Sequence, residues 1–279
     1  MKIIDTPAEM RAWALAQKAA GRSIGFVPTM GALHEGHASL MRAAVHDDSA
    51  VLSIFVNPTQ FAPHEDFDRY PRTFEADCAL AASIGMDAIY APSVAAMYPE
   101  GYATYVEVER LGEGLCGRSR PHHFRGVCTV VTKLFAAVLP DRAYFGQKDA
   151  QQCAIIRRMA RDLDLGVEIV EMPIVREPDG LAMSSRNRYL SPEERTQALC
   201  LSRALEAARE LLESGERSSI RVCDRVRTEM QVVEIDYVEL VDAESLAPVN
   251  QIAAPVLLAV AAHVGKTRLI DNLKFDPSA

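Results

Sequence analysis

The segment FVPTMGALHEGHASL, residues 26–40, places two histidines, His34 and His37, where an apolar run gives way to an amphipathic stretch. The three-residue spacing puts both rings on one face of a helix that begins here, and Gly36 leaves room for a ligand between them. A helix N-terminus exposes unpaired N–H groups and a partial positive charge, so histidines added there extend an anion site. The segment therefore predicts a phosphate-binding helix start.

Other interpretations of the two histidines are plainer. A zinc pair needs a third ligand and usually has H-E-x-x-H spacing, which is one residue longer than the H-E-G-H found here. The six cysteines are scattered without a Cys-x-x-Cys pair, so they add no ligands and are expected to be reduced. Histidines that merely cap a helix stay open as an alternative. VAAHVGKT is no P-loop, because Val260 stands where that motif needs glycine.

Three further motifs carry polar groups that suit the same chemistry, two at predicted strand ends and one in the loop between the predicted domains. VNPTQF contributes Asn57 and Gln60, whose amides can hydrogen-bond a hydroxyl or a carboxylate, although a plain Asn-Pro turn is the alternative. FGQKDAQQ contributes Lys148 and Gln152 at a predicted helix start, where a surface lysine is the alternative. MSSR at 183–186 offers two hydroxyls and a guanidinium, which suit a phosphate but also an ordinary polar loop.

The elements that must position these groups alternate between strand and helix. Continuous apolar runs predict strands buried on both faces, at 23–29, 51–57, 88–92, 143–146 and 167–175. Apolar residues at helical spacing, with a T-x-x-E capping box at Thr6, predict helices at 7–20, 37–46, 73–84, 126–139 and 149–163. This alternation predicts an α/β fold with a doubly wound, parallel, Rossmann-like sheet. Ligands of such sheets bind at the carboxyl ends of the strands, where these motifs fall.

After Val175 the pattern changes. A polar loop leads to Ser191-Pro192-Glu193-Glu194, which combines an N-cap serine, proline at the first helical position and a capping-box glutamate, and a long helix then runs to near Gly215. Strand-like segments follow at 234–241, 256–264 and 267–275. We therefore predict two domains, a Rossmann-like domain over 1–178 and a smaller α+β domain over 179–279 that closes over the site.

Composition narrows the class of partner. The 279-residue chain carries a formal net charge of -8 and no lysine/arginine block, so a nucleic-acid backbone or an anionic membrane is not expected. The N-terminus turns polar after four residues, which argues against a signal peptide, and no run approaches the ~18 apolar residues of a membrane span. A cytoplasmic protein that binds small molecules is the expectation.

At this point the motifs carry a family resemblance. MGALHEGH resembles the His-x-Gly-His signature of the nucleotidyltransferase superfamily, and MSSR resembles its second phosphate-binding signature. A closer similarity covers nearly the whole chain. In the same order, PTMGALHEGH, FVNPTQF, YPRT, RPHHFRGV, YFGQKDAQQ and PIVREPDGLAMSSRN resemble the pantothenate synthetase (pantoate–beta-alanine ligase) family.

The resemblance implies an ATP-dependent ligation in two steps. ATP adenylates the carboxylate of pantoate and releases pyrophosphate, and the amine of β-alanine then attacks pantoyl adenylate to give pantothenate and AMP. It also implies a homodimer and magnesium, with Asp77 as a metal ligand; a carboxylate that caps a helix is the alternative. Attack of one anion on another needs positive charge and hydrogen-bond donors aimed at phosphate, which the motifs supply.

Site residues carry over position by position. The catalytic residues are His34, His37, Lys148 and Arg186, with His37 as the assigned proton donor, although a hydrogen bond to the leaving pyrophosphate stays open. Gln60 and Gln152 bind pantoate, and Gln60 also binds β-alanine. Val127, Val130 and Val131 form an apolar wall for pantoate or a core-facing helix stripe. The ATP-binding residues are Met30, Gly31, Ala32, Leu33, His34, Glu35, Gly36, His37, Gly146, Gln147, Lys148, Asp149, Val175, Met183, Ser184, Ser185 and Arg186.

Departures from the family pattern are modest, at His122, Gln147 and Ala150, and none removes a phosphate-binding group. Two other functions stay open. Another adenylating or cytidylyl-transferring enzyme would keep both phosphate signatures with a different acceptor pocket, against which the glutamines Gln60 and Gln152 argue. A nucleotide-sensing module without catalysis would have no reason to keep Lys148 together with both histidines.

Overall fold

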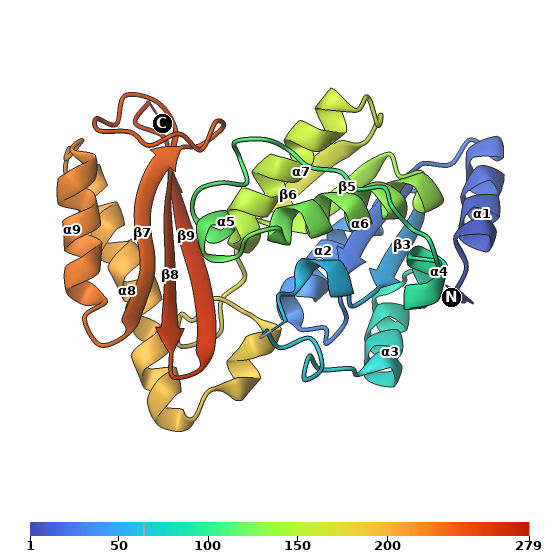
Figure 1. Cartoon of the computed structure of the whole chain (residues 1–279), viewed down its shortest axis with the longest axis horizontal. Coiled ribbons are helices and arrows are strands. Elements are labelled where there is room, and N and C mark those ends of the chain that lie inside the picture. Colours follow the sequence, from blue (N-terminus) through green and yellow to red (C-terminus); the bar gives the residue numbers. More distant parts are fainter. Residues whose placement is uncertain (64, 279) are drawn as a thin grey trace. The chain divides into compact units, whose positions relative to one another are not determined.

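The computed structural model describes residues 1–63 and 65–278 of the chain (Figure 1). They form two compact units. Unit 1 comprises Met1–Glu109, Arg120–Gln147 and Gln152–Pro173, and unit 2 comprises Arg110–Ser119, Lys148–Gln151 and Ile174–Ala279. The main segment of unit 2 thus begins close to the predicted boundary after residue 178, which stays a prediction. Two short segments from the first half of the chain, however, belong to unit 2.

Unit 1 is built on a six-stranded parallel sheet in the order β1-β4-β3-β2-β5-β6. The strands are β1 (Lys2–Ile4), β2 (Ile24–Thr29), β3 (Ser49–Ile54), β4 (Ala88–Tyr90), β5 (Arg142–Gly146) and β6 (Glu168–Met172). The chain moves outward from β2 through β3 to β4 on one side, and from β5 to β6 on the other. The order therefore reverses between β2 and β5, and this switch point is where doubly wound sheets bind ligands. The predicted fold class is confirmed.

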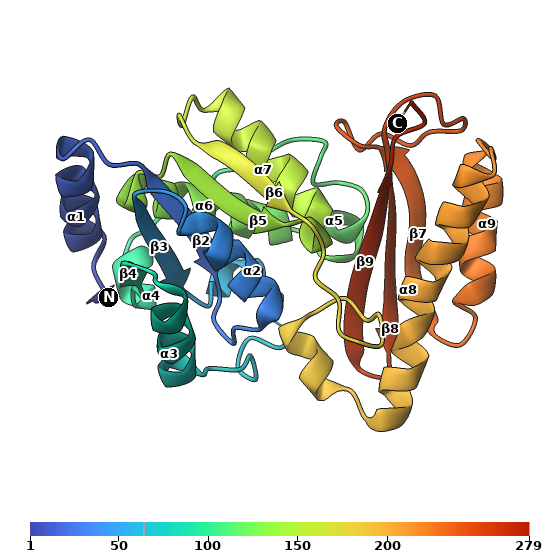
Figure 2. The ribbon, with the colours of Figure 1, turned by 180° about the vertical axis from the view of Figure 1, so that it is seen from behind.

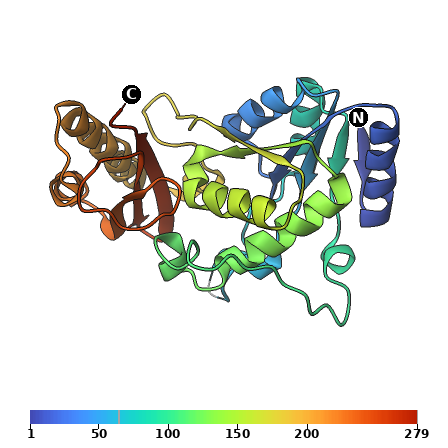
Figure 3. The same ribbon diagram turned by 90° about the horizontal axis from the view of Figure 1, so that it is seen from above.

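Helices cover both faces of this sheet (Figure 3). On one face, Phe26 of β2 packs edge-on against Phe135, with ring centroids 6.2 Å apart. On the other face, Val27 joins a buried cluster with Ala38 and Met41. Adjacent residues of β2 thus pack into hydrophobic cores on opposite faces of the sheet, which explains why the strand is apolar throughout and does not alternate with polar residues. The helices of this part of the chain are α1 (Pro7–Ala19), α2 (Glu35–Ala44), α3 (Phe74–Ile84), α4 (Val94–Met97), α6 (His123–Val138) and α7 (Ala150–Asp162).

Two predictions about the strands need correction. The sequence missed β1, whose three residues are too few to show a pattern. We also predicted that 167–175 is buried on both faces, but β6 lies at the edge of the sheet and its side chains are half-buried or exposed. An edge strand has only one neighbour, so its apolar residues are covered less completely.

Unit 2 contains an antiparallel sheet in the order β7-β8-β9, with two helices packed against it (Figure 2). The elements are α5 (Cys116–Ser119), α8 (Pro192–Glu213), α9 (Ser219–Glu229), β7 (Glu234–Asp242), β8 (Val256–Val264) and β9 (Thr267–Phe275). The start of α8 confirms the predicted capping box, since the Ser191 hydroxyl accepts from Glu194 N–H and Glu194 accepts from Ser191 N–H. The sequence missed α5 and α9, and it placed the three strands within one residue of their observed bounds.

Among the described residues, three short 3₁₀ turns carry predicted site residues: η1 (Pro58–Gln60), η2 (Gln147–Asp149) and η3 (Ser185–Tyr189). Within the described residues, no helix combines the length and the apolar character needed to cross a membrane.

Candidate active site

His34 and His37 form the first turn of α2, which follows β2 at the switch point. His34 is the N-cap, and its Nδ1 accepts a hydrogen bond from Gly36 N–H at 3.2 Å. The Nδ1 of His37 accepts from His34 N–H at 3.3 Å, so the two imidazoles form a reciprocal capping box with ring centroids 4.1 Å apart. Because each Nδ1 is an acceptor, a neutral ring carries its proton on Nε2. Helix capping and phosphate binding are therefore compatible, since each uses a different nitrogen.

The loop that delivers these histidines is strained and is held from a distant segment. Gly31 and Ala32 both have left-handed backbone angles, with φ of 80° and 51°. Asp77, which is 3% exposed in the first turn of α3, accepts hydrogen bonds at 2.9 Å from Ala32 N–H and from Leu33 N–H. A Cβ atom added to Gly31 would lie 3.0 Å from the Asp77 carboxylate, so glycine permits the close approach.

These bonds bear on the magnesium role predicted for Asp77. Each of its oxygens already receives a backbone N–H of the loop, and Oδ1 also accepts from the Thr73 hydroxyl at 3.1 Å. Across residues 1–63 and 65–278, no group of three His, Cys, Asp or Glu side chains is arranged to hold a metal ion. The Asp77 carboxylate thus holds the loop through these bonds, and its role as a magnesium ligand stays a prediction.

Gln60 ends η1, and Asn57 fixes the orientation of its side chain. Asn57 is 1% exposed; its Nδ2 donates to Gln60 Oε1 at 3.0 Å, and its Oδ1 accepts from the Tyr98 hydroxyl at 2.7 Å. With Oε1 used as an acceptor, Gln60 has the N–H groups of Nε2 as donors, and Nε2 donates to Met30 Sδ at 3.2 Å. We expected Asn57 to be able to bind a substrate directly. The structure corrects this, because Asn57 is buried and its amide is fully hydrogen-bonded within the protein.

Residues of the RPHHFRGV motif hold the backbone of Gln60. The sequence alone did not predict a role for this motif. The Gln60 carbonyl accepts from His123 Nδ1 at 2.9 Å and from Arg120 at 3.2 Å. Arg120 also forms two parallel bonds with Glu65, at 2.6 and 2.7 Å. Burial raises the pKa of Glu65, but the bonds from Arg120 outweigh it, so the net pKa is lowered. Gly126 lets α6 lie against η1, since a Cβ there would meet the Thr59 carbonyl at 2.3 Å.

The carboxyl end of β5 lies beside that of β2 and carries Gly146 and Gln147. Gln152 follows in the first turn of α7 and is half-buried. The three valines of α6 proposed as a wall for pantoate are 3–5% exposed, which suits the core interpretation equally well. Unit 1 therefore holds the His-x-Gly-His turn, the end of β5 and both glutamines.

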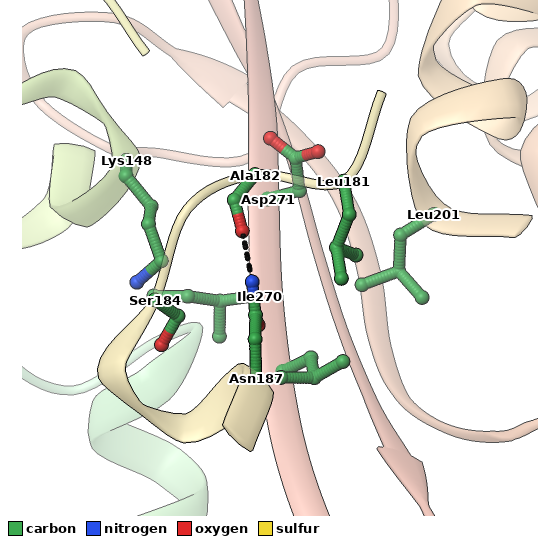
Figure 4. A pocket seen from close by; sticks show the side chains of 9 residues that line it. Lys148, Leu181, Ala182, Ser184, Asn187, Leu201, Ile270 and Asp271 are labelled. Atoms are coloured by element: carbon green, nitrogen blue, oxygen red, sulfur yellow. Dashed lines mark hydrogen bonds between the residues drawn. The ribbon is translucent and has the colours of Figure 1, made fainter. Parts of the chain in front are cut away.

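In unit 2, Lys148 and Ser184 line the same pocket, together with Asn187 and Asp271 (Figure 4). The Lys148 side chain is 21% exposed, and its Nζ lies 3.7 Å from the Asp149 carboxylate. The structure thus brings together, within one unit, the lysine of one predicted phosphate motif and a serine of the other. No sequence pattern could show this, because the two residues are far apart in the chain.

The MSSR segment, residues 183–186, begins at the end of a short hairpin. Met183 N–H donates to the Val175 carbonyl at 3.0 Å, and Arg176 pairs with Ala182. Ser184 then caps η3, with its hydroxyl accepting from Arg186 N–H at 3.2 Å. The first serine is therefore a cap, and η3 carries Ser185 and Arg186 of the motif.

Comparison with known proteins identifies the family. The family described as Pantoate-beta-alanine ligase has a sequence model that matches residues 2–274. The chain belongs to this family. It is therefore an acid–amino-acid ligase, and the resemblance seen in its motifs is confirmed.

Similar proteins are matched over almost their whole length. Pantothenate synthetases of Pelotomaculum thermopropionicum and Heliobacterium modesticaldum are 57% and 58% identical over 277 residues, which is 98% of this chain and 98% and 99% of theirs. The crystal structure of pantothenate synthetase from Thermus thermophilus shares 46% identity at a TM-score of 0.92, covering 98% of this chain and 99% of that one. A pantoate-beta-alanine ligase from Francisella tularensis, complexed with beta-gamma ATP and beta-alanine, shares 31% identity at a TM-score of 0.80, covering 100% and 98%.

Proposed function

We propose that this ligase joins pantoate and β-alanine to pantothenate with ATP, through a pantoyl adenylate that is formed before the amine reacts. The family match over residues 2–274 carries the proposal. The Francisella tularensis relative, whose structure includes an ATP compound and beta-alanine, supports both as substrates. The donor-rich helix start at the switch point of the sheet supports a nucleotide phosphate as the ligand of unit 1.

In the first step, an oxygen of the pantoate carboxylate attacks the α-phosphorus of ATP, and the bond to pyrophosphate breaks. Two anions approach and a third leaves, so the step needs donors and positive charge rather than a covalent nucleophile. The residues proposed for these tasks are His34 and His37, as Nε2–H donors, and the cations Lys148 and Arg186. In the second step, the β-alanine nitrogen attacks the acyl carbon, the carbon–oxygen bond to AMP breaks, and the nitrogen loses a proton.

We propose that His37 acts as a hydrogen-bond donor rather than as a proton donor. Transfer of a proton from Nε2 requires a doubly protonated ring, whose Nδ1–H would then face the backbone N–H of His34 at the 3.3 Å bond. A neutral ring keeps that bond and still offers its Nε2–H to an oxygen of the leaving pyrophosphate. The charge of the leaving group is then stabilised by donors and cations, without protonation.

The oriented amide of Gln60 supports a role in pantoate binding. Its Nε2 presents donors, which suit the hydroxyl or carboxylate oxygens of pantoate, and Gln152 is proposed to bind the same substrate. Magnesium is proposed to arrive bound to the phosphates of ATP, as this ion commonly does, where it would neutralise phosphate charge. A homodimer and a cytoplasmic location stay predictions.

The proposal is tested by measuring ATP–pyrophosphate exchange against a panel of carboxylic acids, with pantothenate formation measured in parallel. We expect pantoate to support exchange far better than acids lacking its hydroxyl, and β-alanine then to give pantothenate and AMP. Exchange with a different acid alone would indicate another adenylating enzyme. ATP binding without exchange for any acid would indicate a nucleotide-sensing module.

A further inference from the structure

Two neighbouring residues of β9, Asp271 and Asn272, are polar yet almost completely buried, with 3% and 5% exposure. They lie in the middle of a nine-residue strand, opposite Val260 and Ala259 of β8. Buried polar groups at such positions are costly unless they are paired. Their partners therefore indicate why unit 2 contains them.

Asn272 contacts the turn that carries Lys148. Its Nδ2 donates to the Lys148 carbonyl at 3.0 Å. Directly after this turn, at the start of α7, Gln151 is also held, because its Oε1 accepts from Cys116 N–H at 3.0 Å and its Nε2 donates to the Leu111 and Gly114 carbonyls at 2.9 Å. The backbone is thus anchored at the Lys148 carbonyl and again three residues later at Gln151, which restrains the position from which the Lys148 side chain extends.

Asp271 contacts the hairpin that leads into MSSR. Its carboxylate accepts two bonds from Arg176, at 2.7 and 3.1 Å, and Arg176 also donates to the Gly180 carbonyl at 3.1 Å. This pair joins β9 to one strand of the hairpin and, through Gly180, to its turn. Ser184 begins directly after the returning strand, so the position of the hairpin determines where the motif starts.

The alternation of side chains along β9 explains how the adjacent residues Asp271 and Asn272 can contact two different segments, the hairpin and the Lys148 turn. Successive side chains point to opposite faces of a sheet, so Asp271 shares a face with Leu269 and Leu273, which belong to the core cluster of unit 2. Asn272 shares the other face with Arg268, which bonds Asp236 of β7. One short piece of β9 thus supports the hairpin from one face and the lysine turn from the other.

We infer that Asp271 and Asn272 are positioning residues for adenylation, with Asn272 setting the position of Lys148 and Asp271 that of the MSSR segment. The inference rests on the proposed function, because Lys148 and MSSR have a catalytic task only if the enzyme activates an acid with ATP. Positioning errors on the order of 1 Å reduce catalysis strongly, by up to about 10²-fold. The support of these two motifs is therefore functionally important.

The first test measures structure without activity. In Asn272→Asp, which keeps the shape but loses the donor, amide hydrogen exchange should rise in peptides covering 148–151 and stay unchanged in 177–183. In Asp271→Asn, the pattern should be reversed. Lys274→Gln, on an exposed position of the same strand, serves as the control and should change neither peptide. Similar increases in both peptides for both variants, or no increase at all, would overturn the inference.

The second test measures coupling in pantoate-dependent ATP–pyrophosphate exchange. Asn272→Asp and Asn272→Ala should each lower the rate about tenfold or more without changing the KM for pantoate. In a Lys148→Ala background, neither substitution should lower the exchange rate further, because the effects of substitutions that act through the same group are not additive. An equal loss in both backgrounds would overturn the inference. Absence of exchange in the wild type would instead refute the proposed function, and the hydrogen-exchange test would still decide the positioning role.

Discussion

The Asp77 carboxylate provides a sharp prediction, because loop anchoring and magnesium binding require different results. In Asp77→Asn, one oxygen remains an acceptor, while the other becomes an NH₂ group that faces the N–H of Ala32 or Leu33. Each lost bond to a charged acceptor is worth about 1.5–3 kcal/mol, and the apposed donors add to the cost, so we expect a loss of about 2–4 kcal/mol. For a chain of this size, that corresponds to a fall of about 5–15 °C in the unfolding midpoint.

The assay is thermal unfolding followed by circular dichroism, in the absence of nucleotide and magnesium. Glu75→Gln is the matched control, since it makes the same acid-to-amide change at an exposed position in the first turn of α3 and should leave the midpoint unchanged. We also expect Asp77→Asn to slow adenylation, because the loop it anchors carries His34 and His37. An unchanged midpoint, combined with an adenylation rate that excess magnesium restores, would refute the anchoring role and identify a metal ligand.

Three further substitutions test the site. Lys148→Ala should lower the adenylation rate by about 10²–10³-fold, whereas Lys274→Ala should not; a loss under tenfold would remove Lys148 from the reaction. Gln60→Leu should strongly lower pantoate-dependent exchange, weaken the discrimination against 2-deoxypantoate in the exchange that remains, and leave ATP affinity intact in calorimetry; loss of ATP binding would make Gln60 structural. The lowered pKa of Glu65 means that its pairing with Arg120 stabilises the fold above its ordinary value of 4.5 and is lost as the pH falls through the lower folded value. The difference in urea stability between the wild type and Glu65→Gln should therefore shrink from pH 6 to pH 3, and a constant difference would contradict this assignment.

Local patterns in the sequence were sufficient for most of the fold. The run around Phe26 and Val27 is apolar because the strand has a core on each face, and this signal is contained within a few residues. The Ser191 capping box is equally local, and it marked the start of α8 correctly. The edge position of β6 was not predictable in this way, because it depends on which strands pair across the sheet.

For the candidate site as well, the sequence predicted the features with a local pattern and missed those that depend on distant contacts. The histidine turn, Lys148 and MSSR could be proposed from residue types and spacing. The groups that hold them could not, since Asp77 lies more than forty positions from the loop it anchors and Asn272 lies 124 positions from Lys148. A buried Asp or Asn in a strand or helix pattern has no local signature of its partner. One partial signal existed, because polar residues at 271 and 272 interrupt an otherwise strand-like run.

The order of the two chemical steps is the central claim, and isotope exchange tests it most directly. Labelled pyrophosphate should enter ATP when enzyme, ATP, magnesium and pantoate are mixed without β-alanine, because pantoyl adenylate forms reversibly before any amine is needed. Addition of β-alanine should then draw the adenylate on to pantothenate and AMP. Exchange that strictly requires β-alanine would contradict the adenylate intermediate and indicate a single concerted step.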